Sequence, residues 1–339
     1  MSLVYFYKDV NNIKTGVNNF FERIAKEMGS STATVGLKIH FGEEKNTTYI
    51  NPEWLKDVKK FFSDPVFIEC NVLYRGRRTF TDDHIAVAKE HGFGFIEIDI
   101  LNGKKGEETV EIPINIGLTK NAKIGRGIEK YRSIVVLSHF KGHIISGFGG
   151  AIKNIGMGLG SRPGKLDMHS SVMPVIDAEK CRGCALCKEN CNVHAIDMEK
   201  GKAVISKEKC IGCAMCIAVC PRKAVRVPFG NDTSERLMEK MAEYAAAAVK
   251  GRCMWYINFL TDMTYRCDCV KRKQKPFMKD IGIVFSRDPV AIDTASLELV
   301  EKNFGKDPFK AHNHRNGKHI LEYSEKIGLG TMDYELREV

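Results

Sequence analysis

Eight of the twelve cysteines in this 339-residue sequence stand in two near-copies of one pattern. The first copy begins at Cys181 and is written CRGCALCKENCN; the second begins at Cys210 and is written CIGCAMCIAVCP. Both have the spacing C-x2-C-x2-C-x3-C, and they lie 29 positions apart. At this offset the flanking residues match as well, for example Val175 with Val204, Ile176 with Ile205 and Ala195 with Ala224. The duplication predicts two half-domains that pack face to face.

This spacing predicts two [4Fe–4S] clusters. Three closely spaced cysteines can surround one cubane, while the fourth points toward the other cluster. The predicted ligands are therefore Cys181, Cys184, Cys187 and Cys220 for one cluster, and Cys210, Cys213, Cys216 and Cys191 for the other. The segment resembles the bacterial two-cluster ferredoxins, except that Asn192 stands where the pattern has a proline, as at Pro221. The alternatives are a disulfide scaffold or a pair of zinc sites, but zinc sites generally use cysteine pairs with longer gaps between them.

The first residues, MSLVYFYKDV, contain no basic stretch followed by an apolar one, so they do not predict a secretory signal. No window approaches the ~18 apolar residues of a membrane span. We therefore expect a cytoplasmic protein without a membrane partner, in which clustered cysteines bind metal rather than form disulfides. The net charge is +10, and the densest basic run is KRKQK at 271–275. Without accompanying aromatic residues this run favours a solvated loop over a nucleic-acid site.

Short apolar segments alternate with helical patterns on both sides of the cysteines, which predicts an α/β fold with a mostly parallel sheet covered by helices on both faces. Predicted strands are Val4–Tyr7, Thr34–Phe41, Val66–Cys70, Phe95–Ile100, Ile134–Ser138, Trp255–Leu260, Ile281–Phe285 and Tyr334–Arg337. Predicted helices are Val17–Met28, Pro52–Phe62 capped by Asn51, Asp82–His91, Thr233–Lys250, Asp288–Asn303 and Gly317–Lys326. We expect one discontinuous α/β domain, 1–172 plus 231–339, with an inserted α+β ferredoxin-like module at 173–230; two separate α/β domains are the alternative.

Three stretches at predicted strand ends carry reactive side chains, and ligands of open α/β sheets bind at such ends. They contain KIHFGEEKNTTYINPE (38–53), LSHFKGHIISGFGGAIKNIGMGLGSRPGK (137–165) and CDC (267–269). Together with SRDPVAIDTASLELV (286–300), they resemble the DUF362 family, a domain of unknown function. The resemblance covers nearly the whole chain. It implies iron–sulfur binding and a redox role, without an agreed reaction.

Two hypotheses compete for these strand ends. In the first, imidazoles and thiolates hold a third metal, for which Zn, Fe and Ni suit such ligands; the candidates are His40, His139, His143, Cys267 and Cys269. In the second, cations and the glycine-rich backbone hold an anionic substrate; the candidates are Lys38, Lys141, Lys153, Arg162 and Lys165. The alternatives are histidines that hydrogen-bond loop backbone, and glycines that serve close packing beside solvated lysines.

These features together predict an iron–sulfur protein with an electron-transfer role, an iron–sulfur oxidoreductase if the pocket is catalytic. A redox partner protein and a small anionic substrate are the expected partners. One alternative is an accessory protein that handles metals or clusters. Another is a binding protein in which the clusters are structural.

Overall fold

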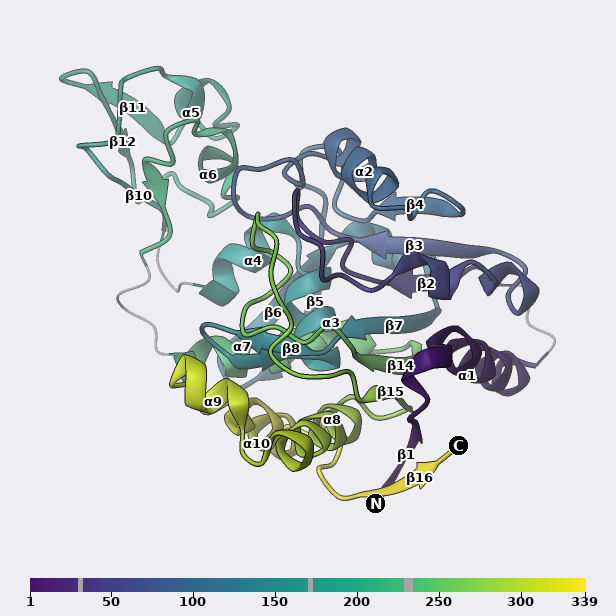
Figure 1. Ribbon diagram of the computed structural model, residues 1–339. Helices are drawn as coiled ribbons and strands as arrows, with labels where there is room; N and C mark the ends of the chain where they lie inside the picture. Colours follow the sequence, from purple (N-terminus) through teal and green to yellow (C-terminus); the bar gives the residue numbers. More distant parts are fainter. Residues whose placement is uncertain (30–32, 170–172, 229–233) are drawn as a thin grey trace.

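The computed structural model describes residues 1–29, 33–169, 173–228 and 234–339. Its centre is an eight-stranded sheet in the order β16-β1-β15-β14-β7-β2-β3-β4 (Figure 1). Only β15 runs antiparallel to its neighbours, so the sheet is mostly parallel, as the sequence predicts. The strands are β1 (Ser2–Tyr7), β2 (Val35–Lys38), β3 (Pro65–Glu69), β4 (Glu97–Ile100), β7 (Ser133–His139), β14 (Cys253–Leu260), β15 (Gly282–Ser286) and β16 (Tyr334–Glu338).

Helices cover both faces of this sheet, because its buried strands are apolar on both sides. Along β7, Ile134 and Val136 face one core, while Val135 and Leu137 face the other. The first core is closed by α3 (Ala151–Leu159), α4 (Arg162–His169), α7 (Ser234–Val249), α8 (Pro289–Phe304), α9 (Pro308–Asn313) and α10 (Lys318–Lys326). The second is closed by α1 (Ile13–Met28), α2 (Thr81–Glu90) and the 3₁₀ turns η2 (Pro52–Leu55) and η3 (Val58–Lys60). Among the described residues, no helix has both the length and the apolar character of a membrane span.

Strands from both ends of the chain belong to the one sheet. The order β1-β15-β14-β7 places strands from the C-terminal part between strands from the N-terminal part. β7 pairs in parallel with β14, joining Ser133–His139 to Cys253–Phe259. The two segments that flank the cysteines therefore share one core. Smaller hairpins are formed by β5 (Thr109–Ile116) with β6 (Thr119–Gly125) and by β8 (Lys141–His143) with β9 (Gly147–Gly149), and further 3₁₀ turns are η1 (Val10–Asn12) and η4 (Arg126–Lys130).

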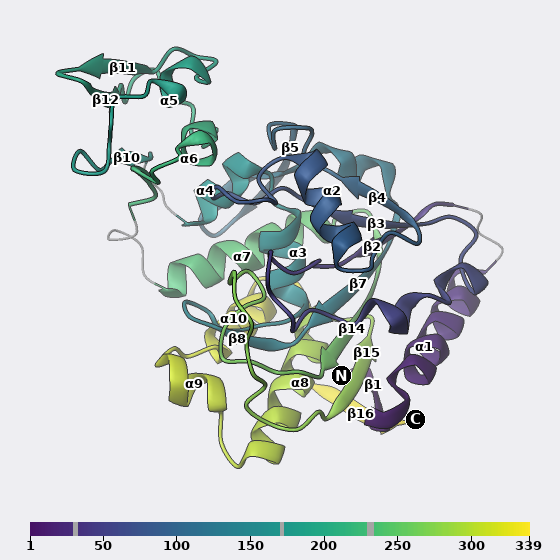
Figure 2. The same ribbon diagram turned by 45° about the horizontal axis from the view of Figure 1, so that its top comes forward.

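The cysteine-rich segment forms its own small unit at one end of the body, beside α4 (Figures 1 and 2). Its two ends pair as β10 (Val175–Ile176) and β13 (Val225–Arg226), and its middle is the hairpin of β11 (Ile196–Glu199) and β12 (Lys202–Ile205). Two short helices, α5 (Leu186–Glu189) and α6 (Met215–Val219), occupy equivalent places in the two copies. The predicted module boundaries fall beside 170–172 and 229–233, which lie outside the described residues, as does the predicted helix start at Thr233.

Two sequence predictions are wrong. Pro52–Phe62 is not one α-helix: Asn51 caps it as predicted, but the chain forms two 3₁₀ turns. The reason is that Leu55 and Val58, both fully buried, are three residues apart, the period of a 3₁₀ turn. The glycine-rich stretch 147–165 is not a loop either, since most of it forms β9, α3 and α4. A Cβ at Gly156 would lie 2.1 Å from the Met241 carbonyl of α7, so that glycine lets two helices pack closely.

Candidate functional site

Two cavities in the cysteine-rich unit are each lined by four cysteines. Cys181, Cys184 and Cys187 of the first copy line one cavity together with Cys220 of the second. The other is lined by Cys210, Cys213 and Cys216 of the second copy together with Cys191 of the first. The empty volumes are nearly equal, about 380 and 350 Å³. Each copy thus contributes three sulfur atoms to one cavity and a fourth to the other.

The backbone around these sulfur atoms repeats from copy to copy. The amide of Ala195 donates to Cys191 Sγ at 3.2 Å, and the amide of Ala224 donates to Cys220 Sγ at the same distance. A third amide, that of Ala203, donates to Cys181 Sγ at 3.5 Å. Hydrogen bonds from amides stabilise a sulfur that carries negative charge. The Ala203 amide lowers the pKa of Cys181, whereas burial raises the pKa of Cys187, Cys213 and Cys216.

The ligand loops also need unusual backbone conformations, and both copies adopt them at the same places. Gly183 and Gly212 have φ of 68°, and Ala185 and Ala214 have φ of 59° and 60°. A non-glycine residue in the left-handed region is uncommon and carries a conformational cost. Because the small alanine lies immediately before α5 or α6, this conformation turns the chain around the cavity and directs the next cysteine into it.

The cysteine geometry bears on which metal group could fit. Within the described ranges, no three His, Cys, Asp or Glu side chains are grouped closely enough to hold a single metal ion. A zinc ion holds its thiolates at about 2.3 Å, which requires the sulfur atoms to converge on one point. Here the four cysteines of each set line a cavity.

The body carries a second polar centre, at the carboxyl ends of β2, β3 and β7. Lys38 Nζ is fully buried and donates to Glu69 Oε2 at 2.9 Å and to Asn154 Oδ1 at 2.8 Å. The Asn154 amide in turn donates to the Leu137 carbonyl and the Ser138 hydroxyl at the end of β7. Burial lowers the pKa of Lys38, and the Glu69 carboxylate opposes that shift. Lys38 is therefore enclosed by partners from β3, β7 and α3.

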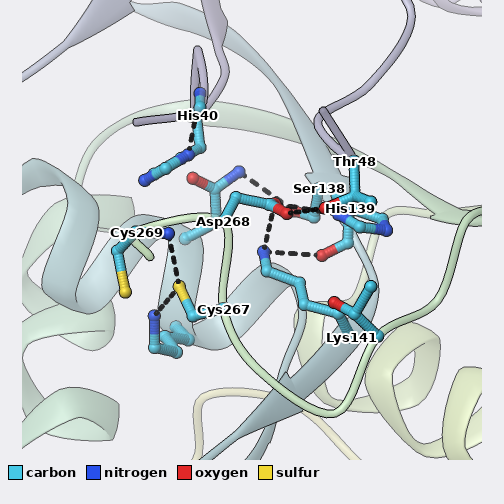
Figure 3. A network of polar contacts seen from close by, with 12 residues as sticks. His40, Thr48, Ser138, His139, Lys141, Cys267, Asp268 and Cys269 are labelled. Carbon is cyan, nitrogen blue, oxygen red and sulfur yellow. Dashed lines mark hydrogen bonds and ion pairs between the residues drawn. The ribbon is translucent and has the colours of Figure 1, made fainter. Parts of the chain in front are cut away.

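His139 lies at the middle of this centre (Figure 3). Its Nδ1 is 2.8 Å from Asp268 Oδ2, and its Nε2 is 2.8 Å from the Thr261 carbonyl. Both ring nitrogens of His139 are therefore engaged by oxygen atoms of the protein itself. Lys141 Nζ lies 3.5 Å from the same carboxylate oxygen. Although burial acts in the opposite direction, these two side chains lower the pKa of Asp268 to about 2.

The other two histidines predicted as metal ligands are neutral. His40 Nδ1 accepts from the Gly42 amide at 3.1 Å, and His143 Nδ1 accepts from the Ser146 amide at 3.1 Å. Burial and the nearby lysines hold the pKa of both rings well below the usual value. In this form Nδ1 is occupied and Nε2 carries the proton, so the ring offers no free lone pair to a metal. The five predicted metal ligands do not form a metal-binding group within the described chain.

Cys267 and Cys269 belong to the loop after β14 and have unequal surroundings. Cys267 is 4% exposed, and its sulfur lies 3.8 Å from Lys153 Nζ and 3.4 Å from the Cys269 amide. The Cys269 thiol hydrogen-bonds this sulfur, which with Lys153 brings the pKa of Cys267 well below the usual value. The pKa of Cys269, which is exposed, is raised by the same contact. One thiolate and one thiol therefore share a proton.

Two of the five predicted anion-binding cations point into the protein rather than toward a ligand. Arg162 is fully buried and donates to the carbonyls of Val72, Thr79 and Lys105. Lys165 Nζ donates to the carbonyls of Gly158 and Gly160, and burial lowers its pKa to about 8. Neither is paired with a carboxylate. Lys153, by contrast, is half-buried and keeps access to solvent.

Sequence reasoning missed the partners of these predicted residues. Glu69, Asp268 and Asn154 hold the buried cations, and Asp293 accepts from the amides of Ala151 and Ile152 at the start of α3. One signal was available for two of them: Glu69 is a charged residue inside the apolar run PVFIEC, and Asp268 separates the two cysteines of CDC. A buried carboxylate in an apolar strand requires a partner.

One loop, residues 71–80, joins the two centres. Leu73 packs in the apolar cluster that contains Cys187, Cys216 and Cys220, and Arg75 Nη1 donates to the Val219 carbonyl at 2.5 Å. The next residue after Leu73 is Tyr74, whose pKa is raised by burial and by the nearby Cys269. The loop therefore packs against the cysteine-rich unit and passes near the CDC loop.

Comparison with known proteins places the chain in a family. The model of the family described as a domain of unknown function (DUF362) matches residues 35–298. The chain belongs to this family. No curated protein matches the DUF362 chain described here. The family match begins at β2 and runs into α8, so it includes the cysteine-rich unit and the strand-end centre alike.

Two solved structures resemble this DUF362 protein at low identity. The lactate racemase apoprotein from Thermoanaerobacterium thermosaccharolyticum is 11% identical with a TM-score of 0.47, over 89% of this chain and 58% of that one. A protein from Thermotoga maritima is 9% identical with a TM-score of 0.43, over 92% of this chain and 59% of that one. The chain thus spans less than two thirds of the length of either structure.

Proposed function

We propose that this protein binds two [4Fe–4S] clusters and uses them to transfer electrons to an anionic substrate at the strand-end centre. The observation that carries the proposal is the pair of similar cavities, each lined by three cysteines of one copy and one of the other. When bound, such a cluster accepts and donates single electrons at a potential set by its surroundings. The residues that would hold each cluster are the four cysteines of each cavity.

The chain's own groups tune such a site in two ways. The amides of Ala195, Ala203 and Ala224 donate to ligand sulfur atoms and thereby stabilise their negative charge. The apolar cluster of Leu73, Leu166 and Ile217 packs against the cysteines and keeps water from one side of them. Burial of this kind and the number of N–H donors are the protein's means of setting a potential.

The paired ends of the cysteine-rich segment support an inserted module. β10 and β13 are antiparallel neighbours, so the chain leaves the body and returns to it at nearly the same place. We propose that 173–230 is a ferredoxin-like module within a discontinuous domain of 1–172 and 231–339. Cys184 is exposed, and so are the nearby apolar side chains of Leu186 and Ile211. A redox partner protein has access to the clusters at this surface.

An anionic substrate follows from the charge of the strand-end centre. Several cations lie there, namely Lys38, Arg78, Lys141, Lys153 and Lys165. Lys153 is half-buried and has no carboxylate partner within the described residues, so an anion near its ammonium group would be stabilised. Lys153 is the cation best placed to meet it.

Anaerobic reconstitution with iron and sulfide tests the proposal. We expect equal amounts of iron and acid-labile sulfide, and paramagnetic signals of reduced [4Fe–4S] clusters after dithionite treatment. A Cys253→Ser variant is the matched control, because Cys253 is exposed and far in sequence from both cavities. It should retain full iron content, whereas Cys184→Ser should not. Binding of zinc in place of iron, or clusters that dithionite cannot reduce, would rule out the proposed electron transfer.

A further inference from the structure

The CDC loop carries two cysteines, Cys267 and Cys269, which Figure 3 shows beside the polar network. Cys269 is exposed, whereas Cys267 is almost completely buried beneath it. The two are linked by a hydrogen bond from the Cys269 amide to Cys267 Sγ, at 3.4 Å, and by the contact between their side chains. From this geometry we propose that Cys267 and Cys269 form a redox-active dithiol that reduces small anionic disulfides.

The surroundings of Cys267 suit a sulfur that alternates between thiolate and disulfide. Lys153 Nζ lies 3.8 Å from its Sγ and compensates the charge of the thiolate. The loop around it is held firmly, because the Cys267 carbonyl accepts from the Val270 amide and from the Gln274 side chain. Asp268, between the cysteines, is anchored by His139 and Thr48. The loop that carries the two cysteines is therefore held in place, with Cys267 Sγ facing Lys153.

The position of the pair couples it to the cysteine module, and this step depends on the function proposed above. The charge of Cys269 affects Tyr74, while the neighbouring Leu73 belongs to the apolar cluster that includes cysteines of both cavities. On the same loop, a Cβ added at Gly76 would lie 3.2 Å from Lys271 Nζ, two residues beyond Cys269. A single loop of the body thus runs from the cysteine-rich unit to the CDC loop.

The reaction balances as a two-step exchange. Cys269 attacks one sulfur of the substrate disulfide and passes its proton to Cys267. This step forms a mixed disulfide between Cys269 and the substrate and releases one substrate thiolate. Cys267 then attacks Cys269 Sγ and forms the Cys267–Cys269 disulfide, while its proton goes to the second substrate group, which leaves as a thiolate and becomes a thiol. Two electrons, which the clusters proposed above would supply, and one proton restore the starting thiolate and thiol. The exposed cysteine thus reaches the substrate and the buried one resolves the adduct.

The charge of the site selects the class of disulfide. Lys153 faces the pair, and its ammonium group has no carboxylate partner among the described residues. A small disulfide with carboxylates gains from this field, whereas a neutral one does not.

Two disulfide probes test the effect of substrate charge: the dicarboxylate dithiobis(nitrobenzoate) and the neutral dithiodipyridine. Each is added to Cys253→Ser holoprotein, in which the exposed cysteine of β14 has been removed. We expect two thiolates released per chain, a Cys267–Cys269 disulfide in the peptide mass spectrum, and faster reaction with the dicarboxylate. Replacing Lys153 with Met should bring the two probes to similar rates. Cys267→Ser should retain one nitrobenzoate adduct on Cys269, and Cys269→Ser should release none from this loop.

Each outcome decides a defined part of the proposal. If the adduct remains on Cys269 when Cys267 is present, the proposed dithiol mechanism is wrong. The same conclusion follows if Cys269 does not react with the probe. To test the coupling, holoprotein whose Cys267–Cys269 pair is oxidised is mixed with holoprotein whose clusters have been reduced by dithionite. The mixing is done under anaerobic conditions, after the excess reductant has been removed. Recovery of both thiols together with reoxidation of the clusters supports it. If the clusters are reduced normally but the disulfide persists, the coupling is wrong; if they cannot be reduced at all, the proposed function fails and the thiol result stands separately.

Discussion

The two centres of this protein differ in how their polar groups are satisfied. In the cysteine-rich unit the sulfur atoms line two cavities and take hydrogen bonds from backbone amides. In the body the side chains bond one another: Lys38 with Glu69, and His139 with Asp268. The first arrangement leaves room for a large ligand that the chain itself does not supply. In the second, most charged side chains bond one another, while Lys153 and the CDC loop keep access to solvent.

The difference shows that a group of reactive side chains in a sequence can serve either of two purposes, ligand binding or stabilisation of the fold. Donors that face a cavity point to a bound group, whereas donors that face each other hold the fold together. His139 shows the second case: both of its ring nitrogens are used within the protein. The buried polar network at the strand ends therefore supports Lys153, Cys267 and Cys269, which are the side chains that could react with a ligand.

The largest expected effect concerns the fourth cysteine that each copy contributes to the cavity of the other copy. Cys220 belongs to the second copy but lines the cavity of the first, so Cys220→Ser should remove about half of the bound iron. The remaining cluster should be that of Cys210, Cys213, Cys216 and Cys191. The check is iron content together with the spectrum of the reduced protein. Cys184→Ser should give the same spectrum as Cys220→Ser, and Cys213→Ser a different one; the opposite match would show that each copy holds its own cluster.

A second prediction concerns the closed network of the body. Asp268 is fully buried and compensates His139 and Lys141. Asp268→Asn leaves both cations without their carboxylate, and losing one partner of a buried pair costs about 3–5 kcal/mol. Urea denaturation followed by circular dichroism measures the change. Asp333→Asn, at an exposed contact with the N-terminus, is the control and should leave the midpoint unchanged. An equally small effect at Asp268 would mean that the network does not stabilise the fold.

A third prediction follows from Lys165, which burial holds at a pKa of about 8, below its usual 10.5. Between these two values the unfolded chain binds one more proton than the folded chain, so the free energy of unfolding rises as the pH rises. The full rise is about 3 kcal/mol at 1.36 kcal/mol per pKa unit. Lys165→Met should lack it, while the exposed Lys120→Met should retain it. Denaturation curves at several pH values provide the test, and identical pH dependence in wild type and Lys165→Met would contradict it.

The sequence predicts the local features well and the long-range ones poorly. The mostly parallel sheet, with helices on both faces, follows from strand patterns that alternate with helical ones, and the Asn51 and Asp288 caps follow from single residues. The cysteine spacing leads to ligand sets that coincide with the linings of the two cavities. By contrast, Lys38 meets Glu69 and Asn154 across 31 and 116 positions, and His139 meets Asp268 across 129.

The errors have the same origin. Glycines between 147 and 165 suggest a loop when considered alone, but Gly156 serves contact with α7, about 85 residues away. Likewise, Arg162, which the sequence suggests as an anion-binding residue, points into the protein because it donates hydrogen bonds to the carbonyls of Val72 and Thr79, which are distant in sequence. Spacing within one segment indicates which residues share a ligand. It does not indicate which residues neutralise each other when they come from different strands.

The smallest expected effect concerns the one place where the two cysteine copies differ in their turn. Asn192 follows Cys191, and Pro221 follows Cys220, with the same turn conformation at both sites. The amides of His194 and Lys223 donate to the carbonyls of Cys191 and Cys220 at 3.0 and 3.2 Å, so the two backbones match closely. A proline in a compatible conformation restricts the unfolded chain, and Asn192→Pro should therefore stabilise the module by about 0.4–1 kcal/mol. Only the cluster that uses Cys191 should change in potential, and a redox titration resolves the two. A loss of stability, or a shift confined to the cluster that uses Cys220, would mean that the two turns are not equivalent.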